Sequence, residues 1–148
     1  MRKRLIISQI LVLLLALGIR LLGFGWVLII LVLTPYGWAC AAVIITVLMT
    51  AAVLSTAQGP VRWRRCTWWL LALADAGLLV FAWCAADTGN IYDSASEQLV
   101  PLALLLTGDN HVSGTEQAIY ATTATVSIVL FAVAAVAALV VAVAGRRR

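Results

Sequence analysis

The sequence predicts an all-α membrane protein, with four transmembrane helices and a short extracytoplasmic helix between spans 3 and 4. Of its 148 residues, 64% are hydrophobic and 11% are charged, whereas soluble domains are about half apolar and about one quarter charged. The apolar residues form long continuous runs. A helix that crosses a bilayer needs about 20 apolar residues, and continuous runs favour helices over the alternating strands of a barrel.

The first span is predicted over residues 5–33 as one helix. Its apolar run is interrupted only by Ser8, Gln9 and Arg20, and residues 34–37 (Thr-Pro-Tyr-Gly) end it with turn chemistry. The basic start resembles the first part of a signal peptide, and residues 16–18 weakly resemble a cleavage site. Because the apolar run continues well beyond Gly18, we expect a retained signal anchor.

Three more spans follow, over residues 38–57, 67–86 and 116–144, and all four form a single domain. Gln58-Gly59-Pro60 ends the second span, since proline cannot continue a helix. Ser113 and Glu116 have the spacing of a capping box at the start of the fourth.

The outer loop, residues 87–115, is the longest connection. It contains an apolar stretch that is too short to cross a bilayer. We expect a short helix from Pro101 to Gly108, because proline is tolerated in the first turn of a helix and glycine commonly ends one. His111 is the only histidine, and Asp109 beside it does not complete a ligand set, so we expect no metal site.

Charge predicts the orientation. Basic clusters at residues 2–4, 62–65 and 146–148 all fall on one side of a four-span arrangement, and the loops of the other side contain no Lys or Arg. Positive charge near span ends stays cytoplasmic, so both termini are expected in the cytoplasm and the chain in the cytoplasmic (inner) membrane. Tryptophans expected to anchor the chain at the membrane interfaces are Trp38, Trp63, Trp68, Trp69 and Trp83.

Two charged residues lie inside the predicted spans, Arg20 in the first and Asp75 in the third. Such residues are costly in lipid and face a partner inside the bundle. If the first crossing begins near Leu14, Arg20 lies about 10 Å and Asp75 about 12 Å from the cytoplasmic side. These depths predict an intramembrane Arg20–Asp75 ion pair, whereas a crossing that began at Leu5 would remove the match. The alternative is that Arg20 extends to the headgroups and Asp75 is protonated or hydrogen-bonded to a neighbour.

Cysteines and alanines suggest two further contacts between helices. Cys40 and Cys84 lie at the outer ends of consecutive spans, so a Cys40–Cys84 disulfide is possible, with ordinary buried thiols as the alternative. In the fourth span, Ala134, Ala138 and Ala142 form a row of small residues that lets helices approach closely. This row fits packing within the bundle or a dimer interface.

No catalytic or phosphate-binding motif is present, so we expect no enzyme and no cofactor. The net charge of +4 indicates contact with anionic lipid and not with nucleic acid. Nine arginines against one lysine suggest a bacterial or phage origin. We expect a protein that binds another membrane protein or its own copies, as an accessory subunit or an immunity or defence protein. The alternatives are a small oligomeric transporter or pore using Asp75 and Arg20, and a phage holin.

Overall fold

The computed structural model describes residues 2–23, 25–56, 61–88, 98–108, 112 and 114–146, and most of these are helical. In chain order the elements are α1 (Arg2–Leu22), α2 (Trp26–Leu33), α3 (Pro35–Ser55), α4 (Val61–Cys84), β1 (Asp87–Thr88), β2 (Gln98–Leu99), α5 (Pro101–Thr107) and α6 (Gly114–Arg146). Among them, α1, α3, α4 and α6 are long and apolar enough to span a membrane. The chain is therefore compatible with a multi-pass membrane protein.

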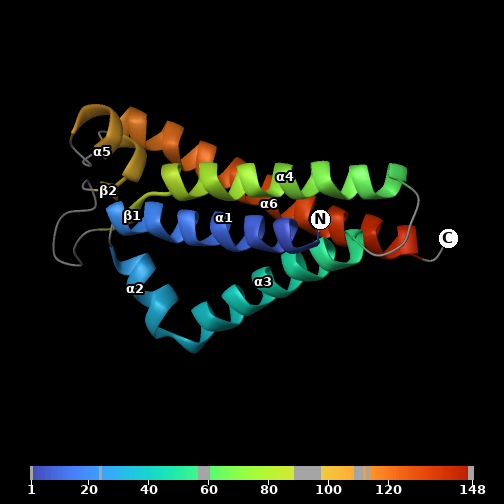
Figure 1. Cartoon of the computed structure of the whole chain (residues 1–148). Coiled ribbons are helices and arrows are strands. Elements are labelled where there is room, and N and C mark those ends of the chain that lie inside the picture. Colours follow the sequence, from blue (N-terminus) through green and yellow to red (C-terminus); the bar gives the residue numbers. More distant parts are fainter. Residues whose placement is uncertain are drawn as a thin grey trace.

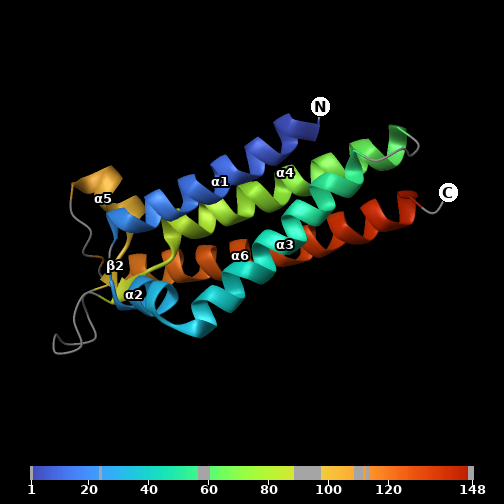
Figure 2. The same cartoon turned by 60° about the horizontal axis from the view of Figure 1, so that its bottom comes forward.

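The helices form a bundle in which α1, α4 and α6 lie side by side and α3 crosses them (Figures 1 and 2). The first residues of α1 and α4 and the last residues of α6 lie at one end of the bundle. We call this end the arginine end, because its basic residues are Lys3, Arg4, Arg62, Arg64, Arg65 and Arg146. At the opposite end, the loop end, α1 and α4 finish close to β1, β2 and α5. All the basic side chains of the described residues except Arg20 thus belong to one end.

The contact between α4 and α6 forms the centre of the bundle. A β-carbon placed on Gly77 would lie 2.9 Å from the backbone oxygen of Ser127 and 3.1 Å from the backbone nitrogen of Phe131, so the two backbones approach closely there. The predicted alanine row is buried at this contact and near it, with Ala134 and Ala138 in the core beside Leu71. Ala142 is also buried. Small residues thus let long helices pack at short range within one chain.

The first apolar run is not one helix, which corrects the predicted span 5–33. It is divided into α1 and the eight-residue α2, and the backbone of Gly25 between them is extended (φ −144°, ψ −169°). A β-carbon on Gly23 would lie 3.0 Å from the ring of Pro101, so the chain passes close to α5 at this point. Glycines interrupt the helix here, although the hydropathy of the run continues without a gap.

α3 begins directly after α2, because Thr34 ends one helix and caps the next. The backbone N–H of Thr34 donates to the carbonyl oxygen of Ile30 over 3.0 Å, and the Thr34 hydroxyl accepts from the backbone N–H of Gly37 over 3.3 Å. Pro35 occupies the first turn, where its missing N–H costs nothing. Pro35 and Gly37, predicted as turn residues, are therefore the beginning of a long helix.

The segment between α4 and α6 carries the remaining elements. Asp87 and Thr88 pair with Leu99 and Gln98 in a two-residue antiparallel ladder. α5 follows and ends at Gly108, which has a positive φ of 76° and donates its N–H to Leu104. Asp109 and His111 lie outside the described residues; among those described, no group of potential metal ligands gathers.

Candidate functional site

A buried ion pair joins α1 to the chain after α4 at the loop end. The guanidinium Nη2 of Arg20 lies 3.0 Å from Oδ2 of Asp87, and the side chains are 12% and 0% exposed. Nη1 of the same guanidinium donates to the backbone oxygen of Ala85. Arg20 therefore connects the end of α1 to Ala85 and Asp87, which lie just after the end of α4.

Asp87 also positions α2. Its Oδ2 accepts a hydrogen bond of 3.2 Å from the backbone N–H of Leu28, in the first turn of α2. A carboxylate is favourable there, because the first N–H groups of a helix have no partner within it and carry partial positive charge. One buried carboxylate thus holds the end of α1, the start of α2 and the β1 ladder together.

Asp75, in the middle of α4, has a different partner. Its Oδ2 accepts a hydrogen bond of 2.8 Å from the amide Nε2 of Gln9 on α1. Gln9 is 2% exposed. Its Oε1 and the Oδ1 of Asp75 are both buried and have no hydrogen-bond partner. A polar pair therefore lies between α1 and α4, separate from the Arg20 ion pair.

These contacts correct the predicted Arg20–Asp75 ion pair. α1 begins at Arg2 and ends at Leu22, so Arg20 lies in its last turn. The depth match required the crossing to begin near Leu14, whereas the helix of the first run that is long and apolar enough to cross a membrane is Lys3–Leu22. The two residues on which the transporter alternative was based therefore belong to separate sites.

Sequence reasoning missed Gln9 and Asp87, although a signal was present. Gln9 and Arg20 are about three helical turns apart and so share one face of α1. Their partners lie 66 and 67 residues further along the chain, a nearly constant offset. Such an offset indicates that α1 runs parallel to α4 and to the residues directly after it. In the sequence, Gln9 only interrupts an apolar run, and Asp87 only begins the predicted outer loop.

The five tryptophans of the predicted interface set lie near helix ends. Trp68 is covered by Arg64, whose guanidinium carbon lies 5.6 Å from the ring centroid. Trp69 is 77% exposed. Trp63 packs against Gly145 of α6. A β-carbon placed on Gly145 would lie 2.9 Å from the β-carbon of Trp63. These three residues gather at the arginine end.

The other two tryptophans lie away from the arginine end. Trp38, in the first turns of α3, is 67% exposed and donates its Nε1 hydrogen to the backbone oxygen of Val32 over 2.8 Å. Trp83, in the last turn of α4, is half-buried against Ala16 and Ile19 of α1. Exposed or half-buried indoles at helix ends fit the headgroup level of a bilayer.

The cysteines are free thiols, which corrects the suggested Cys40–Cys84 disulfide. Cys84 is buried at the end of α4, whereas Cys40 is exposed near the start of α3. The start of α3 diverges from α4, so the two outer ends do not meet (Figures 1 and 2). Cys66, near the arginine end of α4, is also free and exposed.

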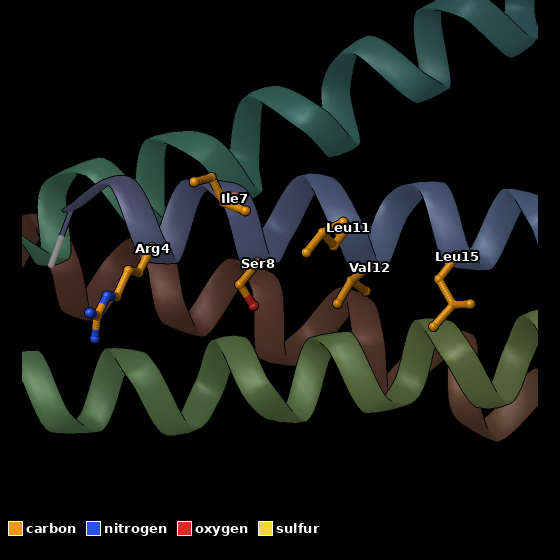
Figure 3. A pocket seen from close by; sticks show the side chains of 6 residues that line it. All are labelled: Arg4, Ile7, Ser8, Leu11, Val12 and Leu15. Atoms are coloured by element: carbon orange, nitrogen blue, oxygen red, sulfur yellow. The ribbon is translucent and has the colours of Figure 1, made fainter.

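An open groove of about 340 Å³ follows one face of α1 (Figure 3). Its lining residues are Arg4, Ile7, Ser8, Leu11, Val12 and Leu15. Arg4 and Ser8 point toward α4 at the arginine end of the groove, and the remainder is apolar. In a bilayer this surface would face lipid, with the one basic group near the headgroups.

Comparisons of the chain with known protein families, with curated proteins and with solved structures found no match. Any function is therefore inferred from the chain's own residues and contacts.

Proposed function

We propose that this chain is a non-enzymatic, multi-pass protein of the bacterial cytoplasmic membrane that acts by binding another membrane protein or its own copies. An accessory subunit or an immunity protein would work in this way. The observation that carries the proposal is a segment that diverges from the bundle and exposes many of its apolar side chains. We call this segment, residues 26–43, the arm; it comprises α2 and the first half of α3.

Apart from Leu28, which is 2% exposed, the arm contributes little to the core of its own chain. α3 adds residues to the main core cluster only from Ile44 onward, chiefly Leu48, Ala51 and Ala52. Before that point Tyr36 and Val43 are 84% and 62% exposed. Figures 1 and 2 show the start of α3 diverging from the other long helices, and only its second half returns to them.

The residue types of the arm suit contact with another helix. Helices in lipid associate through close packing, for which small residues are favourable, since the hydrophobic effect does not separate lipid from leucine. The arm exposes Ala39, Cys40 and Ala42 between the larger Trp38 and Val43. By contrast, the alanines Ala134 and Ala138 of α6 are already buried within the chain. The arm is therefore the segment we assign to partner contact.

The charge distribution supports a location in the cytoplasmic membrane with both termini inside. Lys3, Arg62 and Arg146 belong to different helices, and all lie at the arginine end. At the loop end Arg20 is neutralised by Asp87. Positive charge is retained on the cytoplasmic side, so the arginine end faces the cytoplasm.

This orientation is tested with single cysteines in a variant whose three native cysteines are serine. Thr107→Cys lies at the end of α5, and Val61→Cys at the first residue of α4; both positions are exposed. A membrane-impermeant maleimide should label position 107 in intact cells, and position 61 only after permeabilisation. Labelling of position 61 from outside would contradict the orientation.

Association through the arm is tested by cross-linking from two exposed native cysteines. One variant keeps only Cys40 in the arm, and the other keeps only Cys66 near the arginine end. A membrane-permeant bis-maleimide or photoreactive maleimide should give a discrete heavier adduct from Cys40 and none from Cys66. Coexpression of two differently tagged copies shows whether the adduct contains a second copy.

A matched pair of bulky substitutions separates association from folding. Ala42 in the arm and Ala132 on α6 are both exposed, so leucine at either position leaves the bundle intact. Ala42→Leu should reduce the Cys40 adduct several-fold, whereas Ala132→Leu should not. A chain that gives no adduct in cells, or gives one equally from Cys66, would rule out the arm as the contact.

A further inference from the structure

Gln9 and Asp75 leave two buried oxygen atoms unsatisfied at the same place. Their side chains are joined by the bond from Nε2 to Oδ2, 2.8 Å long. The second polar atom of each group, Oε1 of Gln9 and Oδ1 of Asp75, is buried without a partner. Buried polar atoms are nearly always hydrogen-bonded, so this pair requires a chemical explanation.

The chemistry of the two groups indicates what is missing. An amide and a carboxyl group are both planar, and each places its two polar atoms side by side. When Nε2 donates to Oδ2 and the two planar groups lie in one plane, the remaining Oε1 and Oδ1 are directed toward each other. In an ionised carboxylate both are acceptors, and neither can donate to the other. A single proton on Oδ1 would convert this opposed pair into a second hydrogen bond.

We propose that Asp75 binds a proton in the folded protein, and that Gln9 and Asp75 form a neutral acid–amide pair. Nε2–H of Gln9 donates to Oδ2, and Oδ1–H of Asp75 donates to Oε1 of Gln9. Both orphaned atoms are then satisfied, and no net charge remains between α1 and α4. This assignment does not depend on the proposed association through the arm.

Among the described side chains, no charged group of the neighbouring helices is paired with Asp75. The titratable and basic groups among the described side chains of α4 and of the helices packed on it are Lys3, Arg4, Arg20, Tyr36, Cys40, Arg62, Arg64, Arg65, Cys66, Cys84, Glu116, Tyr120 and Arg146. They lie toward helix ends. Arg20 is paired with Asp87. Arg4 is exposed and points toward α4 at the arginine end, about 7.5 Å along the helix axis from Gln9. Among the described side chains, no cation is therefore paired with Asp75 to hold it as a carboxylate.

The neutral pair makes the α1–α4 contact dependent on a proton. Loss of the proton removes one of the two hydrogen bonds and leaves a charge in a region without a counterion. Such a charge is costly inside a bilayer. Deprotonation should therefore loosen α1 from α4, and α1 is the more exposed of the two helices.

Infrared spectroscopy of the full chain in lipid nanodiscs at pH 7 tests the assignment directly. A protonated carboxylic acid gives a carbonyl band that a carboxylate lacks. Asp75→Asn should abolish one such band, whereas Glu116→Gln, at an exposed carboxyl group of α6, should leave it unchanged. Gln9→Leu should keep the band and shift its frequency, because the acid proton loses its acceptor. If Asp75→Asn removes no acid band, Asp75 is ionised and the proposal is wrong.

The pH dependence of stability gives an independent test. Asparagine at position 75 can form the same two bonds with Gln9, so Asp75→Asn imitates the protonated state. The folded wild type binds a proton that the unfolded chain releases more readily, so its stability should fall as pH rises. An unfolded aspartate releases its proton above about pH 4, so the thermal midpoints of wild type and Asp75→Asn should agree near pH 4. The wild-type midpoint should fall progressively below that of Asp75→Asn as the pH rises from there. Curves that stay parallel from about pH 4 to 8 would overturn the proposal.

Discussion

Replacing Asp87 with alanine is expected to lower the free energy of unfolding by about 3–5 kcal/mol, the range for breaking one side of a buried ion pair. Among the described residues, the substitution leaves the nearly buried guanidinium of Arg20 with the carbonyl of Ala85 as its one partner. It also removes the acceptor for the backbone N–H of Leu28. Thermal or denaturant unfolding in detergent micelles measures the loss, and α2 should become more sensitive to protease.

A double variant distinguishes the uncompensated charge from lost packing. Arg20→Leu combined with Asp87→Ala removes both charges, so it should recover a large part of the stability lost in Asp87→Ala alone. Arg62→Ala, which removes an exposed charge from the first turn of α4, is the control and should stay within about 0.5 kcal/mol of wild type. A double variant less stable than the single one would show that the charge is not the cause.

Replacing Gly77 with leucine is expected to destabilise the bundle by about 3 kcal/mol, the upper part of the usual range for overpacking. The first added carbon would lie 2.9 Å from the backbone oxygen of Ser127 and 3.1 Å from the backbone nitrogen of Phe131. Because these neighbours are backbone atoms, they cannot move aside by changing a rotamer. α6 must shift as a whole, which disturbs the core around Ala134 and Ala138.

The same substitution at Gly18 is the control for Gly77→Leu. Gly18 also lies in a membrane-length helix, but a β-carbon there would meet no atom within 4 Å. Gly18→Leu should be neutral or stabilising by about 0.5–1 kcal/mol, because glycine is a poor helix former. Equal losses of stability from the two substitutions, measured by unfolding in the same detergent, would contradict a close α4–α6 contact at Gly77.

Local patterns in the sequence were sufficient to predict most of the helices. Four long helices of membrane-spanning apolarity were expected, and the described residues contain four. Pro101 and Gly108 were expected to bound a short helix, and α5 occupies Pro101–Thr107. These features depend on composition and on residues within a turn or two of each other. The error in the first span has the same origin, since hydropathy alone does not detect a break at Gly23 and Gly25.

The partners of the polar residues were not predictable in this way. Arg20 was assigned to Asp75 by an estimate of depth, and depth depends on where α1 begins and ends. Its partner Asp87 lies beyond the end of α4, in a position read as loop. Gln9, the partner of Asp75, carries no charge, so its position in an apolar run does not indicate a buried polar contact. The separation of Cys40 from Cys84 likewise follows from the direction of α3, which no local pattern specifies.

The sequence by itself determined the length and apolarity of the helices and the gathering of basic residues at one end, because these properties follow from residue order and composition. Only the tertiary structure decided which polar groups meet. Rotation and axial register between helices are set by close contacts such as those of Gly77 with α6 and of Gly23 with Pro101. A change of one residue in that register would rotate a side chain by about 100° around its helix. Gln9 and Arg20 would then no longer face Asp75 and Asp87.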